Sequence, residues 1–391
     1  MKNLWQDEEA KNFKSDIDLR VYTSNLLGRN DKLVLHGGGN TSVKTKIDKE
    51  DILFVKGSGW DLVTIKAPGF SPVKLDALLK MARLKTLSDS DMVKEQKNAM
   101  IDKNAPNPSV EAILHAIIPF KFVDHTHADA IVTISNSKTG KENIKRLFPN
   151  FLIIPYVMPG FILAQTIYNK SKDIDWSKCE GIILHNHGIF TFDNDAKISY
   201  TKMLNAVTKA EKFLQEFAKI TLKNSNTEKK INIKRLQNII SKHKGFEVVF
   251  NANNSDLAYT YASKNNLEFS TCRGVLTPEH IIRTKRVPLV LKDDNFEEAI
   301  KKYEADYIKY FKEFSSDEIC LNPSPNYAII KNFGIVSFGK NEKEASIIND
   351  IVEHTMQAVL QADMLGGYKS INKKDSFAME YWELEQAKLK K

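Results

Sequence analysis

Residues 122–132, "FVDHTHADAIV", combine a strand-like apolar run with two histidines that lie two positions apart. Side chains of a β-strand point alternately to its two faces, so His125 and His127 are expected on one face, opposite Asp124 and Thr126. A lone core histidine is usually satisfied by hydrogen bonds. Two in register favour a metal ion instead, because a buried polar group without a partner costs about 1–3 kcal/mol.

A second pair of histidines stands in "GIILHNHGIFTF", residues 181–192, which we interpret as one further strand. His185 and His187 would share one face of it, and Gly188 would allow close backbone approach at its end. Three imidazoles with an open fourth position are typical of a catalytic rather than a structural zinc site. The sequence therefore predicts that the third ligand comes from this segment.

Glu111 stands in "PSVEAILHAII", residues 108–118, the start of an expected helix. From local sequence alone, Ser109 would cap this helix, and the acidic residue would stabilise the helix dipole. The alternative makes Glu111 a general acid/base that faces the metal. His115, one turn further on, is expected to be a packed or capping residue.

Two glycine-rich loops interrupt the N-terminal region. The segments "DKLVLHGGGNTSVKTK" (31–46) and "DILFVKGSGWDLVTI" (51–65) each predict a strand, a glycine turn and a second strand. Hairpin turns explain such glycines without any function. Alternatively, backbone N–H groups and hydroxyls in these loops, together with the helix start at Ser109, would form a phosphate pocket.

The rest of the chain mixes expected strands and helices, with helices at 72–84, from Ser88 onward and at 202–220. The sequence predicts a catalytic domain over 1–222, a basic linker or helix over 223–245 and a C-terminal α/β domain over 246–391. A solvated segment explains the basic residues of 223–245 better than a nucleic-acid patch does.

The C-terminal domain echoes the second histidine segment. "AIIKNFGIVSF", residues 328–338, aligns without gaps on residues 182–192, with Phe333 in the place of His187. Chance likeness and an internal duplication both explain the match. In a duplication, the second copy would be degenerate and would lack the metal ligands.

Composition limits the classes of partner. The 391 residues carry a net charge of +8, which favours anionic ligands, but no arginine-rich arm or zinc finger indicates nucleic acid. The three cysteines form no close pair, the N-terminus lacks the apolar core of a signal peptide, and no apolar stretch is long enough to span a bilayer. We expect a cytoplasmic protein without membrane association.

Together these motifs resemble the class II aldolase/adducin family, most closely the aldolase portion of bifunctional rhamnulose-1-phosphate aldolase/short-chain dehydrogenase proteins. The matching stretches are "VYTSNLLG", "HGGGNTSVKT", "VKGSGWDL", "PSVEAILHAIIPFKFVDHTHADAI", "YVMPGF", "NHGIF", "TPEHIIRTKRVPL" and "EYWELEQAKL". The resemblance implies that His125, His127 and His187 bind zinc and that Glu111 is the acid/base. It also implies a phosphate site made of Gly39, Asn40, Ser58, Gly59 and Ser109. A second serine common in the family is Val110 here.

The family likeness further implies a three-layer α/β/α sandwich around a mostly antiparallel sheet, assembled as a homo-oligomer, commonly a tetramer. The implied reaction is cleavage of a ketose 1-phosphate, with L-rhamnulose 1-phosphate of rhamnose degradation as the best candidate, to dihydroxyacetone phosphate and L-lactaldehyde. Sugar-phosphate epimerisation or dehydration, or a non-catalytic scaffold like adducin, are the alternatives.

Two further expectations concern the C-terminal part of the sequence. The fused relatives continue into a dehydrogenase domain after the stretch at 380–391, so no NAD is expected here and a dehydrogenase partner would be a separate chain. Within "TPEHIIRTK", His280, Arg283 and Lys285 belong either to an anion site or to a solvated turn.

His185, in the second histidine segment, is a candidate for a residue that supports the metal ligands.

Overall fold

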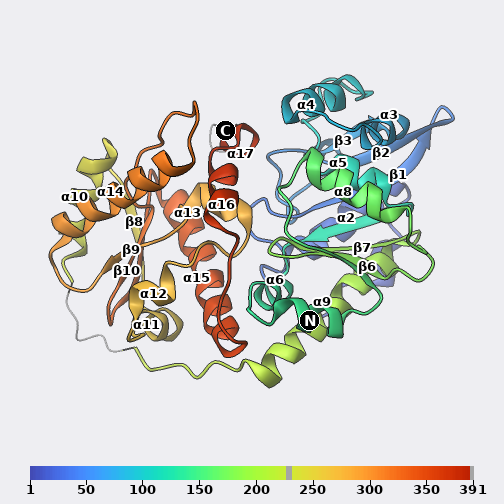
Figure 1. Cartoon of the computed structure of the whole chain (residues 1–391). Helices are drawn as coiled ribbons and strands as arrows, with labels where there is room; N and C mark the ends of the chain where they lie inside the picture. The colour runs from blue at the N-terminus through green and yellow to red at the C-terminus, as the bar shows by residue number, and fades with distance from the viewer. Residues whose placement is uncertain (226–230, 388–391) are drawn as a thin grey trace. The chain divides into compact units, whose positions relative to one another are not determined.

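The computed structural model describes residues 1–225 and 231–387, and these residues divide into two compact units (Figure 1). Unit 1 comprises residues 1–132 and 141–213, and unit 2 comprises 133–140 and the chain from 214 onward. Within the basic segment predicted as a linker or helix, α10 (Ile233–Lys244) is helical and buries Leu236 and Ile240. Residues 226–230 of that segment lie outside the described residues.

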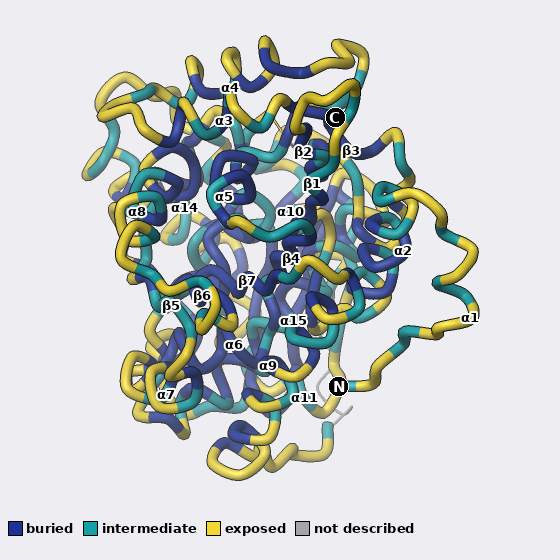
Figure 2. The backbone as a smooth tube through the Cα atoms, turned by 90° about the vertical axis from the view of Figure 1, so that its right-hand side faces the viewer, coloured by how far each residue is buried: buried dark blue, intermediate teal, exposed yellow. Residues whose placement is uncertain are grey.

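Unit 1 is built on a seven-stranded sheet with the order β3-β2-β1-β4-β7-β6-β5. Neighbouring strands are antiparallel, except that β5 runs parallel to β6. The central strands β4 and β7 are dark blue in Figure 2, in agreement with their almost complete burial. The strand bounds are β1 Asn40–Ile47, β2 Glu50–Lys56, β3 Phe70–Lys74, β4 Phe122–Thr126, β5 Phe151–Ile154, β6 Gly181–Leu184 and β7 Gly188–Asp193.

Helices cover both faces of this sheet. On one face, Leu114 of α5 (Ala112–Ile117) and Leu163 of α8 (Phe161–Ser171) belong to an apolar cluster that includes Phe190 of β7. On the other face, Arg20 of α2 (Asp16–Gly28) forms a buried ion pair with Asp124 of β4, at 2.5 Å. The Asp124 carboxylate also accepts a hydrogen bond from Ser199 of α9 (Ala196–Phe217). The predicted three-layer sandwich with a mostly antiparallel sheet is confirmed.

Of the remaining helices of unit 1, α3 and α4 were predicted, and α3 is shorter than the expected 72–84 because residues 70–74 form β3. Ser88 accepts a hydrogen bond from the Asp91 N–H at the start of α4, as the capping-box pattern indicates. The bounds are α1 Asp7–Ala10, η1 Ala67–Gly69, α3 Leu75–Ala82, α4 Asp89–Asn98, α6 Asp129–Ser135 and α7 Gly140–Leu147. The last residues of α6 and of α9 belong to unit 2.

Four local predictions were wrong. The run 122–132 is a strand only as far as Thr126, and α6 begins at Asp129, so His127 follows the strand rather than belonging to it. Residues 31–35 and 60–65 form turns or irregular structure rather than strands, so only the strand after the first glycine loop and the strand before the second exist. Residues 181–192 form a hairpin of two strands, not one strand, because Asn186 adopts a left-handed φ of 60° between them. His185 and His187 therefore lie in a turn and do not share a strand face.

Unit 2 has a four-stranded sheet with the order β8-β11-β10-β9, in which the pair β9–β10 is parallel. Its core joins Leu236 of α10 and Phe296 of α14 to Val336 and Phe338 of the sheet. Residues 133–140 attach here through the Lys138 N–H, which donates to the Gly367 carbonyl oxygen at 2.9 Å. The bounds are β8 Val249–Asn253, α11 Asp256–Ala262, α12 Leu267–Thr271, η2 Pro278–His280, α13 Ile281–Thr284, β9 Leu289–Leu291, α14 Phe296–Phe314, β10 Tyr327–Ile330, β11 Gly334–Gly339, α15 Glu342–Met364, α16 Lys373–Glu380 and α17 Glu383–Gln386.

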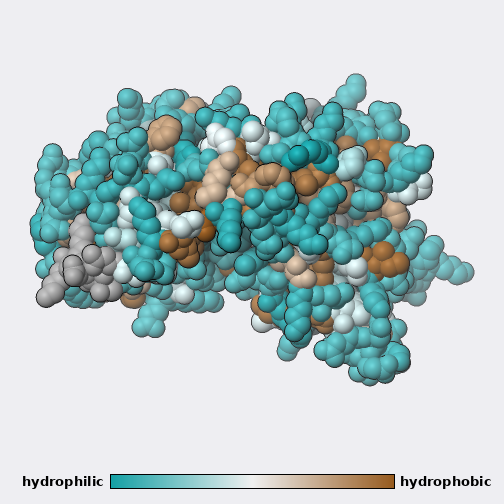
Figure 3. Space-filling model, turned by 90° about the horizontal axis from the view of Figure 1, so that it is seen from below, coloured by the Kyte–Doolittle hydropathy of each residue, from teal (hydrophilic) through white to brown (hydrophobic). Residues whose placement is uncertain are grey.

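The face drawn in Figure 3 is mostly hydrophilic, with hydrophobic side chains in separate small patches. Over the two described ranges, every helix is either too short or too polar to cross a membrane.

Candidate metal centre

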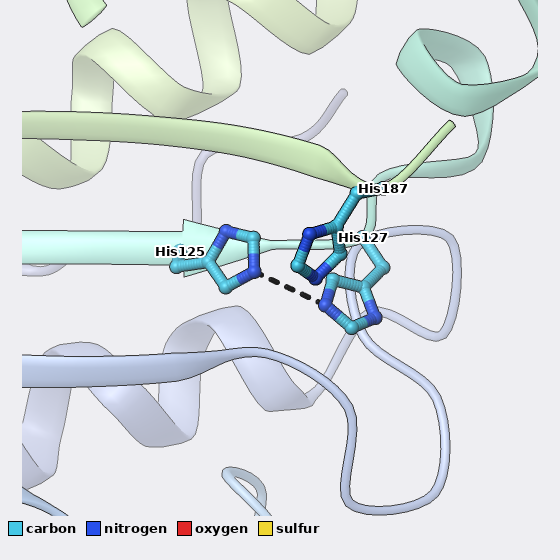
Figure 4. A group of neighbouring side chains, drawn as sticks. All are labelled: His125, His127 and His187. Carbon is cyan, nitrogen blue, oxygen red and sulfur yellow. Dashed lines mark hydrogen bonds between the residues drawn. The ribbon is translucent and has the colours of Figure 1, made fainter. Parts of the chain in front are cut away.

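Three histidines of unit 1 converge at one end of the central strands β4 and β7 (Figure 4). The ring centroids are 4.9 Å apart for His125 and His127, 5.2 Å for His125 and His187, and 5.0 Å for His127 and His187. One nitrogen of each ring lies within 4.8 Å of the others. Because β4 and β7 are antiparallel neighbours, the end of β4 lies beside the start of β7, and the three rings come together. Such a set matches a three-histidine metal site.

The tautomer of His125 suits metal binding. Its Nδ1 lies 3.1 Å from the carbonyl oxygen of Ile189, which can only accept, so Nδ1 carries the proton. Its Nε2 then presents a lone pair, and this atom lies 3.1 Å from Nε2 of His127. Burial lowers the pKa of His125 well below its usual range, so the ring is neutral near pH 7, as a ligand must be.

Gly188 makes the close approach of the strands possible. A Cβ at this position would lie 2.3 Å from the Thr126 carbonyl oxygen and 3.0 Å from Cε1 of His125. Any larger residue would therefore push β7 away from β4 and separate the histidines. The close backbone approach expected at Gly188 is confirmed.

Glu111 lies directly against the histidines. Its Oε2 is 3.5 Å from Nε2 of His125, and its Oε1 is 3.7 Å from Nε2 of His187. Glu111 precedes α5 and its side chain makes no capping hydrogen bond, so helix capping does not explain this residue. Ser109 does not cap α5 from the N-cap position either, although its Oγ accepts from the Glu111 N–H at 3.3 Å.

The surroundings of Glu111 favour its carboxylate form. Burial raises the pKa of Glu111, whereas positive charge on the imidazoles of His125 and His187, when they are protonated, and a hydrogen bond from Asn40 lower it. The Asn40 Nδ2 donates to Oε2 at 2.6 Å, and this contact favours the carboxylate even while the rings are neutral.

The two glycine loops meet beside this cluster. The Ser58 N–H donates to the Asn107 carbonyl oxygen at 2.9 Å, and the Ser109 N–H donates to the Lys56 carbonyl oxygen at 3.1 Å. Gly59 follows with a φ of 91°. The second loop is thereby joined to the segment that leads into Glu111.

The first glycine loop approaches the histidines from β1. A Cβ on Gly39 would lie 2.7 Å from the His125 carbonyl oxygen, and Asn40 pairs with His125 across the sheet. The Asn40 Nδ2 also donates to Ser109 Oγ at 3.1 Å. The structure thus brings Gly39, Asn40 and Ser109 to the metal cluster, and the Ser58–Gly59 loop to the segment that leads into Ser109.

Two family models match this chain. The class II aldolase and adducin N-terminal domain matches residues 19–214, and the second domain of class II aldolases matches residues 227–389. The chain belongs to the class II aldolase and adducin family. The metal cluster and Glu111 both lie within the N-terminal match.

Two individual proteins are similar to this member of the family. An uncharacterized oxidoreductase of Bacillus subtilis (strain 168), YuxG, is 28% identical over 420 residues, and the chain spans 60% of its length. The solved N-terminal class II aldolase domain of a Thermoplasma acidophilum protein is 40% identical, with a TM-score of 0.50. That match covers 55% of this chain and 99% of the Thermoplasma domain.

Sequence reasoning missed the hydrogen-bonding roles of His115 and Ser42. Both are fully buried, and Ser42 Oγ lies 2.8 Å from Nδ1 of His115. Strand alternation does predict that Asn40 and Ser42 share one face of β1, opposite the residues that face α2. No local pattern indicates that α5 packs on that face.

The other flagged residues lie elsewhere. His185 is in the β6–β7 turn, where its N–H donates to the Ile154 carbonyl oxygen at 2.9 Å. In unit 2, His280 and Lys285 are buried, so a solvated turn does not describe this segment. The Lys285 Nζ lies 3.7 Å from the Tyr307 ring centroid and 3.9 Å from Glu380 Oε1.

Proposed function

We propose that this protein is a zinc-dependent class II aldolase that reversibly cleaves a ketose 1-phosphate to dihydroxyacetone phosphate and an aldehyde. L-Rhamnulose 1-phosphate and L-lactaldehyde are the preferred substrate and product. The observation that carries the proposal is the Glu111 carboxylate, 3.5 Å and 3.7 Å from two imidazoles of the three-histidine cluster. An enzyme needs an ionisable group at an open metal position, whereas a scaffold protein does not.

His125, His127 and His187 would hold the metal through neutral imidazoles. Bound there, a divalent metal supplies Lewis-acid stabilisation of negative charge on substrate oxygens. We assign zinc because three imidazoles with an open position are its typical catalytic ligand set, although other divalent metals accept imidazole too.

Glu111 would move the proton. When the carbon–carbon bond breaks, the hydroxyl of the aldehyde half gives its proton to the Glu111 carboxylate, and the dihydroxyacetone phosphate half is left as an enediolate. Glu111 delivers a proton to the enediolate carbon, and in synthesis its carboxylate removes that same proton. The carboxylate form favoured by Asn40 is the form that synthesis requires.

The glycine loops would hold the phosphate. Gly39, Ser58, Gly59 and Ser109 offer backbone N–H groups or hydroxyls, as anion sites in glycine-rich turns do. Binding the phosphate there would keep the reacting carbons beside Glu111. The net charge of +8 also favours an anionic substrate.

The proposal includes a homo-oligomeric, cytoplasmic enzyme. A separate dehydrogenase partner that removes the aldehyde remains part of this proposal. The oligomeric state and the dehydrogenase partner derive from the family likeness, and the cytoplasmic location derives from the three free cysteines.

The test is a coupled assay for dihydroxyacetone phosphate release from L-rhamnulose 1-phosphate, with and without a chelator. Release that stops with chelator and returns with zinc supports the aldolase. Metal-loaded protein that converts the sugar phosphate without releasing dihydroxyacetone phosphate indicates epimerisation or dehydration instead. Protein that neither retains metal nor reacts indicates a scaffold.

A further inference from the structure

A buried row of hydrogen bonds leads from the central sheet to Glu111. Ser42 Oγ lies 2.8 Å from His115 Nδ1, the His115 Nε2 bonds to Asn40 Oδ1, and the Asn40 Nδ2 donates to Glu111 Oε2 at 2.6 Å. Asn40 and Ser42 are two positions apart on β1 and so face the same helix, α5, which carries His115. The row is shielded from water, since all four side chains are at most 7% exposed.

The direction of every bond in this row follows from its last member. A carboxylate only accepts, so Asn40 must present Nδ2 to Glu111 and Oδ1 to His115. Since Oδ1 also only accepts, His115 Nε2 must carry the ring proton. Burial lowers the pKa of His115 to about 3, so the ring holds one proton near pH 7, and Nδ1 is left to accept from the Ser42 hydroxyl. All three donors point toward Glu111.

We infer that His115 and Asn40 are positioning residues for Glu111, which they hold by Oε2 with both carboxylate oxygens against the metal cluster. This inference rests on the proposed function, in which Glu111 exchanges a proton with the substrate. Oε1 has no hydrogen-bond partner among the described residues, and it lies 3.7 Å from His187 Nε2. Without the ring proton of His115, the Asn40 amide could reverse and set its oxygen against the carboxylate.

The same geometry changes the role of Asn40. Its two Nδ2 hydrogens are directed to Glu111 Oε2 and Ser109 Oγ, and its Oδ1 accepts from His115. The side chain therefore has no donor left for a phosphate oxygen. We assign the Asn40 side chain to Glu111 rather than to the phosphate site that the family likeness implies.

The test measures the incorporation of solvent deuterium into dihydroxyacetone phosphate by NMR, in zinc-loaded protein. This exchange needs Glu111 and the metal but no aldehyde, so it does not depend on which ketose is the natural substrate. Two variants are compared with wild type. His115→Gln keeps a donor for Asn40 and an acceptor for Ser42, whereas His115→Leu removes both in a side chain of similar size.

We expect His115→Leu to lower the maximal exchange rate about tenfold, as the loss of one hydrogen bond of positioning predicts. Zinc content and the half-saturating concentration of dihydroxyacetone phosphate should stay unchanged. His115→Gln should keep the rate within about threefold of wild type, because glutamine still donates a hydrogen bond to Asn40. If His115 served only to fill space, the glutamine and leucine variants would behave alike.

A milder variant covers the case in which His115→Leu does not fold. Ser42→Ala leaves the imidazole in place and removes the donor to Nδ1, so the exchange rate should fall about threefold. In the His115→Leu background, when that variant folds, Ser42→Ala should have no effect, because the two residues then no longer interact.

The outcomes separate the two proposals. Wild-type protein that retains zinc but gives no exchange overturns the proposed aldolase. Wild-type exchange that His115→Leu leaves unchanged overturns the positioning role and leaves the aldolase intact. An equal loss in His115→Gln and His115→Leu, or an unchanged rate in Ser42→Ala, also overturns the positioning role, since donor chemistry would then be irrelevant.

Discussion

In unit 1 the hairpin β6–β7 pairs Leu184 with Gly188, and in unit 2 the hairpin β10–β11 pairs Ile330 with Gly334. Both turns contain an asparagine in the left-handed region, with φ 60° at Asn186 and 56° at Asn332. Each hairpin has a parallel strand on one side and an antiparallel strand on the other, followed by a long helix. The two hairpins therefore share a backbone, and their sequences are identical at five of the eleven aligned positions.

The glycines have the same task in both units. A Cβ on Gly188 would lie 2.3 Å from the Thr126 carbonyl oxygen, and a Cβ on Gly334 would lie 2.2 Å from the Asn253 carbonyl oxygen. Thr126 and Asn253 occupy matching places in the registers of β4 and β8. This agreement supports, as a proposal, the internal duplication in which unit 2 is the degenerate copy.

Chemistry is where the two hairpins differ. At the places of His187, His125 and His127, the registers put Phe333, Ala252 and Asn254 in unit 2. Phe333 packs against the apolar core of unit 2 rather than facing other ligands. The comparison indicates that backbone geometry and metal ligands are separate requirements, so one can be retained while the other is lost.

The largest effect is expected when the first hairpin is given the residue of the second. His187→Phe should abolish metal binding and lower turnover by more than about 100-fold, because even changes to groups that only support a ligand cost 10–100-fold. Metal analysis and the coupled assay measure this. Phe333→His is the matched control, and it should gain no metal because Ala252 and Asn254 offer no ligands. Retained zinc in His187→Phe would contradict the ligand assignment.

Glu111→Gln should keep the metal but lower turnover by about 10²–10⁴-fold, because the amide cannot exchange the substrate proton. Zinc content and dihydroxyacetone phosphate release from the same preparation check both points. Turnover near that of wild type would remove Glu111 from its role and reduce the difference between the units to the metal alone.

The two glycines sharpen the comparison at the level of stability. Gly188→Ala and Gly334→Ala should each lower the free energy of unfolding by about 1–3 kcal/mol, because each Cβ would overlap a carbonyl oxygen. Denaturant titration measures the loss. Only Gly188→Ala should also weaken zinc binding, since its Cβ would lie 3.0 Å from His125 Cε1. Equal metal content in both variants would show that the histidines tolerate the displacement.

The smallest effect concerns pH. The pKa of His115 is lowered to about 3 in the folded protein, so between about pH 6.5 and 3 the unfolded chain binds the proton that the folded chain excludes. Stability should therefore fall on acidification through this window, by up to about 1.4 kcal/mol per pH unit for this residue. His115→Gln should show a shallower loss in denaturant titrations at pH 7 and pH 5. Equal slopes would contradict a buried, neutral His115.

Much of the candidate site was predictable because its signals are local. The spacing of two indicates that His125 and His127 belong together, although β4 ends at Thr126. The local sequence favoured a capping role for Glu111, so only the family likeness indicated its acid/base role. The turn between His185 and His187 was not predictable from alternation, because a left-handed asparagine breaks the strand without changing the apolar pattern.

By itself, the sequence determined the family and the mixed α/β class and indicated the two histidine pairs, since these depend on residue type and short-range spacing, whereas the role of Glu111 was indicated only by the family likeness. Only the tertiary structure decided that β4 and β7 are neighbours, that α5 lies above β1, and that Asn40, bonded to His115, donates to Glu111. Those contacts join residues about 70 positions apart. They arise when strands pair and helices pack, which no local pattern encodes.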